Sequence, residues 1–158
     1  MGTGFSTITI ALAAFVHHAA AFAIVAALAV ELALMRMPLT LASARRIRRA
    51  DLAYGISAGI IVAIGFFRVF YFEKGSEYYF HSAPFLAKVT VFAIVGIASI
   101  FPTVEFLSWG KMLKEGKIPE VSERRMQALR SVVHWELVGL LVVLLCAALM
   151  ARGIGVMG

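Results

Sequence analysis

Long apolar runs alternate with short polar breaks along the whole chain. Each run is long enough to cross a hydrocarbon core as a helix, which takes about 20 residues. The runs also exceed strand length and lack the alternation of a barrel strand. The pattern therefore predicts an all-α integral membrane four-helix bundle, with residues 1–158 as a single transmembrane domain. The four helices are expected at about residues 6–34, 51–72, 84–110 and 123–151.

Composition agrees with a chain that sits in lipid. The sequence is 61% hydrophobic and 15% charged, and a soluble domain of this length would carry more charge. The single cysteine, Cys146, lies in an apolar run and excludes an intrachain disulfide. No phosphate-binding loop or dinucleotide fingerprint is present, because the glycines at 55 and 59 lie within a span and follow no strand. The lipid bilayer is the first expected partner.

Basic residues predict which way the helices run. Ten of the fifteen lysines and arginines flank the two connections at about 35–50 and 111–125. Short cytoplasmic loops carry such an excess, so these connections should face inward and both termini outward. We expect a multi-pass protein of the bacterial inner (cytoplasmic) membrane. The net charge of +6 follows from this topology and from anionic headgroups, and we expect no nucleic-acid partner.

Several ionisable residues lie inside the predicted spans, where they are costly and usually face the bundle interior. At 100° per residue, His17 and Glu31 fall within about 40° of each other, whereas His18 shares its side with small alanines. The other three helices also carry one polar stripe each. These stripes are Tyr54, Ser57 and Arg68; Lys88, Ser99 and Thr103; and Glu123, Gln127, Arg130 and His134.

Depth along the helices suggests a ligand. At 1.5 Å per residue, Arg68 and Lys88 lie about 6 Å below the outer ends of their helices, His17 about 16 Å and His134 about 25 Å. Haem b fits this order, because imidazoles of His17 and His134 bind iron while Arg68 and Lys88 pair with propionates. Lys88 is also a candidate catalytic residue, as an axial ligand or proton donor, since a desolvated lysine loses its proton readily.

A purely structural interpretation stays open for the same residues. Intramembrane histidines such as His17, His18 and His134 often form hydrogen bonds between helices. Arg68 and Lys88 lie near helix ends, where long cationic side chains extend towards the headgroups. The small-residue side of His18 suits a close contact between helices or subunits, so we expect a homo-oligomer.

Two short segments carry a family resemblance. AFVHH at 14–18 resembles the first helix of the HemJ-type protoporphyrinogen oxidases, and FLAKVTVFAIV at 85–95 resembles their third helix. The chain as a whole resembles small bacterial four-helix membrane proteins of unknown function, and more distantly CopD-like membrane domains. The HemJ resemblance implies haem, porphyrinogen oxidation and functional roles for His17 and Lys88. An Asn-Glu-Pro feature of that family is absent, and the corresponding stretch reads ALRSVVHWEL.

Three function classes follow. The first is a haem-b membrane protein, with redox activity on a porphyrinogen or quinol. The second is a metal or haem permease of the CopD kind. The third is an accessory membrane subunit without a cofactor, in which polar residues only specify helix packing.

The charge distribution gives the first testable prediction. A reporter enzyme fused after Gly158 should be active on the outer side of the membrane and inactive in the cytoplasm, because the basic connections hold the opposite ends of the helices inside. A fusion placed in the basic connection at residue 40 is the control and should give the reverse pattern. A Gly158 fusion that works only in the cytoplasm would contradict this topology.

Overall fold

The computed structural model describes residues 6–67 and 83–154, and within these ranges every regular element is a helix. Helices α4, α5 and α6 follow one another with single-residue breaks and act as one span, Ala83–Lys114. The described part thus holds four helices long and apolar enough to cross a membrane, which confirms the predicted all-α architecture. The elements are α1 (Thr7–Met35), α2 (Leu41–Phe67), α4 (Ala83–Ala98), α5 (Ile100–Ser108), α6 (Gly110–Lys114) and α7 (Glu123–Ala151).

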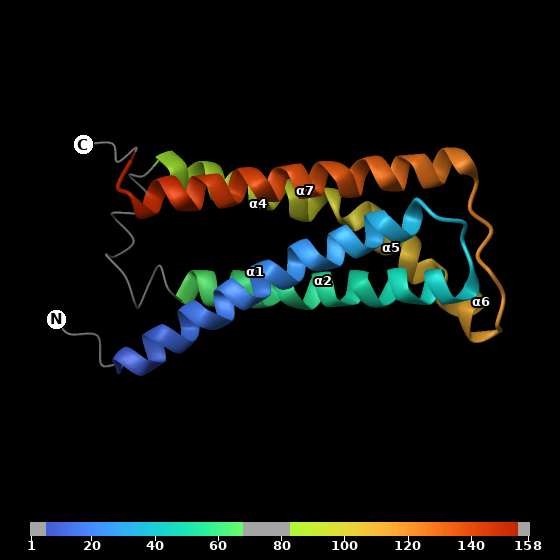
Figure 1. The fold of residues 1–158 in the computed structure, drawn as a ribbon, viewed down its shortest axis with the longest axis horizontal. Helices are drawn as coiled ribbons and strands as arrows, with labels where there is room; N and C mark the ends of the chain where they lie inside the picture. Colours follow the sequence, from blue (N-terminus) through green and yellow to red (C-terminus); the bar gives the residue numbers. More distant parts are fainter. Residues whose placement is uncertain (1–5, 68–82, 155–158) are drawn as a thin grey trace.

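The four spans form two antiparallel pairs that pack against each other (Figure 1). Helix α1 packs along α2, α4 packs along α7, and α1 contacts α7 between the pairs. Helix α1 begins and α7 ends at the same end of the bundle, while the α1–α2 and α6–α7 connections lie at the opposite end (Figure 1). This arrangement is the one that the basic connections require, and we call the end with those connections the inner end.

Helix α2 begins ten residues earlier than the sequence predicted, at Leu41 instead of residue 51. The Thr40 hydroxyl accepts a hydrogen bond from the Ser43 backbone N–H (3.1 Å), and the Ser43 hydroxyl accepts one from the Thr40 backbone N–H (2.8 Å). This reciprocal cap satisfies backbone donors that a helix start leaves free. The arginine run after it consists of good helix formers. Four arginines therefore lie on α2 itself and not in a loop.

The third span bends at Ser99, between α4 and α5. Pro102 explains the bend, because it lacks the N–H that would bond to the Ala98 carbonyl and its ring crowds that carbonyl. The Ser99 hydroxyl donates to the Gly96 carbonyl (2.8 Å) at the same turn. As a result α4 stays with α7, whereas α5 and α6 cross to the first turns of α2 (Figure 1).

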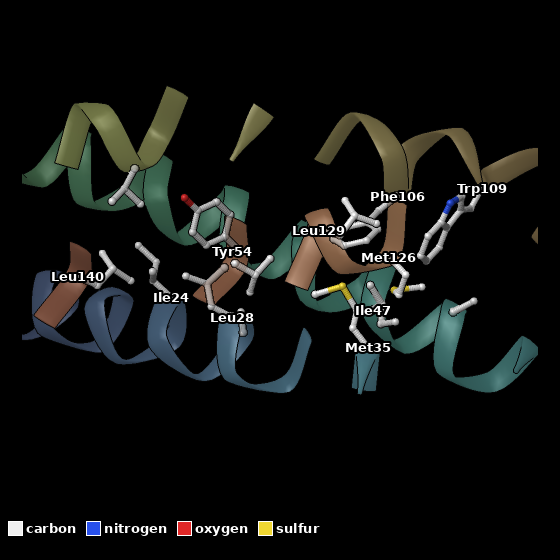
Figure 2. Packing of buried hydrophobic residues seen from close by; sticks show 14 of the residues in the cluster. Ile24, Leu28, Met35, Ile47, Tyr54, Phe106, Trp109, Met126, Leu129 and Leu140 are labelled. Atoms are coloured by element: carbon white, nitrogen blue, oxygen red, sulfur yellow. The ribbon is translucent and has the colours of Figure 1, made fainter. Parts of the chain in front are cut away.

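The buried core is concentrated where all four spans meet, and the outer surface of the bundle is apolar. Figure 2 shows Ile24 and Leu28 of α1 facing Leu140 and Tyr54, with Trp109 and Phe106 nearer the inner end. Many large apolar side chains are instead exposed on the helix surfaces. Such a surface is stable only in contact with lipid. Exposed examples are Phe15, Phe22, Phe66, Ile97, Trp135 and Leu141.

Candidate functional site

Three carboxyl groups from three helices face the interior of the bundle without converging on one point. Glu31 of α1 and Glu136 of α7 are each only 1% exposed, and Asp51 of α2 is 6% exposed. The three side chains lie within electrostatic range of one another. We call Glu31, Asp51 and Glu136 the carboxyl cluster.

The spacing of apolar neighbours places the two glutamates in the interior. On α1, Glu31 continues the buried positions Ile24 and Leu28 at intervals of three and four residues. On α7, Glu136 takes the same place between Val133 and Leu140. Residues at these intervals share one face of a helix. Each glutamate is therefore carried into the core by the apolar side chains on either side of it.

Asp51 is the member of the cluster with a clear hydrogen-bond partner. Its Oδ1 accepts a hydrogen bond from the Thr103 hydroxyl of α5, at 2.6 Å. One turn further along α2, Tyr54 contacts Ser99 at the bend of the third span. These two contacts join α2 to the bent span through polar groups.

The two glutamates lack such partners in the part of the chain that the structure describes. There, Glu31 Oε1 and both carboxylate oxygens of Glu136 are buried without a hydrogen bond. Burying an ionised carboxylate in an apolar interior without a counter-ion is costly, by several kcal/mol even after relaxation. Each of these groups thus needs a proton or a cationic ligand.

Glu105 is an acidic residue of the same chain whose role is structural. Its Oε2 accepts a hydrogen bond from Arg125 Nε (2.9 Å) and forms an ion pair with Arg125 Nη2 (2.8 Å). Its Oε1 accepts one from the indole N–H of Trp109 (3.2 Å). Both oxygens are satisfied, and the residue joins α5 to α7. Glu31 and Glu136 do not follow this pattern.

A groove runs beside the cluster between α2 and the bent span. It encloses about 1220 Å³, and Asp51, Tyr54 and Thr103 lie along its wall. Its inner end is lined by Arg45, Arg48, Arg49 and Lys114. We call this the α2–α5 groove. It connects the carboxyl cluster, through Asp51, with the surface of the bundle.

The histidine and lysine of the predicted haem site both lie in the outer half of the bundle, on α1 and α4. A Cβ on Gly65 of α2 would lie 3.8 Å from His17 Cε1, so the half-buried imidazole lies against that helix. Lys88 is half-buried on α4, with its Nζ 5.2 Å from the centre of the Phe85 ring.

Two contacts with α7 fix the depths of α1 and α4. The Arg130 Nε donates to the Met35 carbonyl (2.7 Å), and Val95 packs against Gly139. Counting 1.5 Å per residue from these contacts places both His17 and Lys88 in the outer half of the bundle.

The remaining predicted residues lie elsewhere. His134 is exposed on α7 and lies about 20 Å deeper along the bundle than His17, so the structure does not bring these two histidines together. His18 is exposed, and its Nδ1 lies 2.6 Å from the Ala14 carbonyl, within hydrogen-bond distance. Arg68 lies outside the described residues. Across residues 6–67 and 83–154, no three histidine, cysteine or acidic side chains converge as a metal site.

Three of the four residues in the polar stripe expected on the last helix do not line the interior, whereas the fourth, Arg130, is half-buried and donates a hydrogen bond to the Met35 carbonyl of α1. Glu123, Gln127 and His134 are exposed, because Met126, Leu129, Val133 and Leu140 occupy the buried face of α7. The spacing of these apolar residues is the sequence signal that places Glu136 on the buried face of α7. Asp51 was missed because the sequence placed it at the start of a helix, whereas it lies about three turns inside α2.

The fold and the buried polar cluster together define a multi-pass four-helix membrane protein. Residues 9–155 match the family described as predicted membrane protein (DUF2214), and the chain belongs to this family. No curated protein and no solved structure matches the chain. The family supports the membrane assignment, and it adds nothing to the resemblance to HemJ-type oxidases or CopD-like domains.

The contrast between the two kinds of acid gives a stability prediction. Glu136→Gln should leave the free energy of unfolding in lipid unchanged, because the neutral amide keeps the shape and no hydrogen bond is lost. Glu105→Gln should lower it by about 1–2 kcal/mol, because it removes a charged partner of Arg125. Unfolding by a denaturing detergent measures both. An equal loss in both variants would show that Glu136 has a structural partner.

Proposed function

We propose that this protein binds and transfers protons inside the membrane through its carboxyl cluster. Glu31 and Glu136 hold the protons, and Asp51 exchanges them with the surroundings. The observation that carries the proposal is the pair of almost fully buried glutamates without hydrogen-bond partners among the described residues. Chains of acidic residues within a bundle are the usual components of intramembrane proton relays.

A structural role explains this cluster less well. A polar group that specifies helix packing does so by hydrogen bonding to another helix, as Glu105 does through Arg125 of α7. A buried carboxyl without a hydrogen-bond partner stabilises helix packing less than an apolar residue does, because its desolvation costs free energy that no hydrogen bond offsets. Protons neutralise the buried glutamates, and they are available from either side of the membrane.

The position of the apolar core supports proton exchange between the carboxyl cluster and the inner side of the membrane. On the outer side of the cluster, Ile24 and Leu28 of α1 pack with Leu140 of α7 (Figure 2). This layer separates the carboxyl cluster from His17. Asp51 lies on the wall of the α2–α5 groove, so it is the carboxyl that joins the cluster to the surface. In the bacterial inner membrane that we propose as its location, protons would enter from the cytoplasmic side.

Infrared spectroscopy of the protein in lipid nanodiscs tests the proposal. Transfer into D₂O should shift the carbonyl band of the protonated glutamates as their protons exchange. Asp51→Asn should slow this exchange at least tenfold, because it removes the only acid on the groove wall among the described residues. Glu31→Gln and Glu136→Gln should each remove part of the band.

Glu105→Gln is the matched control, because this acid is ion-paired and lies outside the cluster. It should leave both the band and its exchange rate unchanged. Exchange at the same rate in wild type and Asp51→Asn would contradict the route through Asp51. A spectrum without any band that Glu31→Gln and Glu136→Gln remove would contradict the proton sites themselves.

A second candidate function is haem-b binding with redox activity on a quinol or porphyrinogen. The placement of the half-buried His17 and Lys88 in the outer half of the bundle favours it. The two predicted histidine ligands are not equally suited to hold a haem. His17 is half-buried, whereas His134 is exposed and lies about 20 Å deeper in the bundle. His17 would supply an imidazole for such a group, and Lys88 an amine or a cation that pairs with a propionate. A haem bound there would supply one-electron redox chemistry.

An absorption spectrum of the detergent-purified protein tests the haem candidate. His17→Ala should abolish a Soret band and the bands seen after dithionite reduction, because it removes the imidazole at this depth. His18→Ala and His134→Ala should keep them, since both side chains are exposed. A colourless wild-type protein would exclude this candidate and leave the proton proposal standing.

A further inference from the structure

We propose that the α2–α5 groove is a binding site for an anionic phospholipid of the inner leaflet. The cationic residues at its inner end hold the phosphate, and the acyl chains lie along α2 and the bent span. This inference goes beyond the proton proposal and rests on different residues. It would stand even if the carboxyl cluster were found to hold no protons.

The groove exists because the third span bends away from α2. Pro102 directs α5 towards the start of α2 and leaves α4 beside α7, so among the described residues α4 makes little contact with the middle of α2 on this side. Gly55 and Gly59 of α2 and Gly96 of α4 line this part of the groove. A Cβ added to any of the three would meet nothing within 4 Å. The volume of about 1220 Å³ exceeds that of ordinary small-molecule pockets, about 300–1,000 Å³.

Four cations gather at the inner end of the groove, Arg45, Arg48, Arg49 and Lys114. Among the described residues, none of them forms an ion pair with an acidic side chain; the pairs present involve other lysines and arginines.

Two of these arginines lie against α6, one of them with a hydrogen bond to its backbone. Arg45 Nη2 donates to the Leu113 carbonyl (3.1 Å). The Arg48 guanidinium lies so close to Gly110 that a Cβ there would be 3.1 Å from its Nη2. Held guanidinium groups suit a phosphate, because they offer several donors in a rigid plane.

An anionic lipid explains both halves of the groove. The apolar length between α2 and α4 matches acyl chains, and the cations lie at the end that faces the cytoplasm, where the leaflet carries anionic headgroups. Basic pockets between helices on this side of a membrane commonly hold such headgroups. A second copy of the chain fits less well, because it would bring its own arginines to the same place.

Native mass spectrometry of the full chain in detergent, with added phosphatidylglycerol or phosphatidylcholine, tests the site. Wild type should bind phosphatidylglycerol more tightly than phosphatidylcholine. Arg49→Gln should weaken phosphatidylglycerol binding about fivefold, the effect of one basic residue near an anionic headgroup. The matched control is Arg46→Gln, since Arg46 is exposed on the same helix but does not line the groove. It should bind like wild type.

Gly59→Phe tests the acyl half of the site without changing any charge. The ring would enter the groove, where nothing opposes it within 4 Å of the new Cβ, and should reduce binding at least as much as Arg49→Gln. Equal phosphatidylglycerol affinity in the Arg46 and Arg49 variants would overturn the proposal, because surface charge alone would then explain binding.

Two other results would also overturn it. Inorganic phosphate that displaces phosphatidylglycerol at comparable concentration would indicate a simple anion site. A Gly59→Phe variant that changes oligomeric state but binds phosphatidylglycerol normally would show that a second copy covers the groove.

Discussion

The cost of placing a carboxyl group in the apolar interior of a membrane bundle is the constraint on which this structure depends. Apolar residues at helical intervals carry Glu31 and Glu136 into the core, where they are 1% exposed. The chain gives a third acid, Asp51, one strong hydrogen bond from Thr103 and leaves the two glutamates without partners among the described residues. Such groups persist at a cost to stability, which is the usual mark of a functional site in a membrane.

The bend of the third span connects this cluster with its surroundings. Pro102 weakens the helix at Ser99, and α5 then crosses towards α2 while it keeps contact with α7 through Glu105 and Arg125. That crossing brings Thr103 to Asp51 and also opens the α2–α5 groove along the middle of α2. One local feature of the sequence thus positions the acid, its partner and the groove that reaches them.

The hydropathy pattern predicted the four spans well, since a long apolar run is nearly sufficient to specify a membrane helix. Helix phase alone also related His17 to Glu31, and Tyr54 to Ser57. The cluster was harder to predict, because its three acids come from three helices. Their proximity depends on the bend, tilt and register of the spans, which the sequence pattern does not give. Asp51 in addition seemed terminal, because the arginines before it resembled a loop until the cap at Thr40 placed them in α2. On α7 the polar stripe through His134 suggested the wrong face, since lipid-facing helices need not be apolar all round.

Carbon NMR of the protein in lipid, with the glutamate side-chain carboxyl carbons isotopically labelled, tests the central claim most directly. The chemical shift of a carboxyl carbon reports whether the group carries a proton. We expect that, near neutral pH, the signals lost in Glu31→Gln and Glu136→Gln have the shift of a neutral acid. The signal lost in Glu105→Gln should have the shift of a carboxylate, because Arg125 is its counter-ion. Carboxylate shifts for all three glutamates would contradict the account and would show that Glu31 and Glu136 are held as anions by a cation.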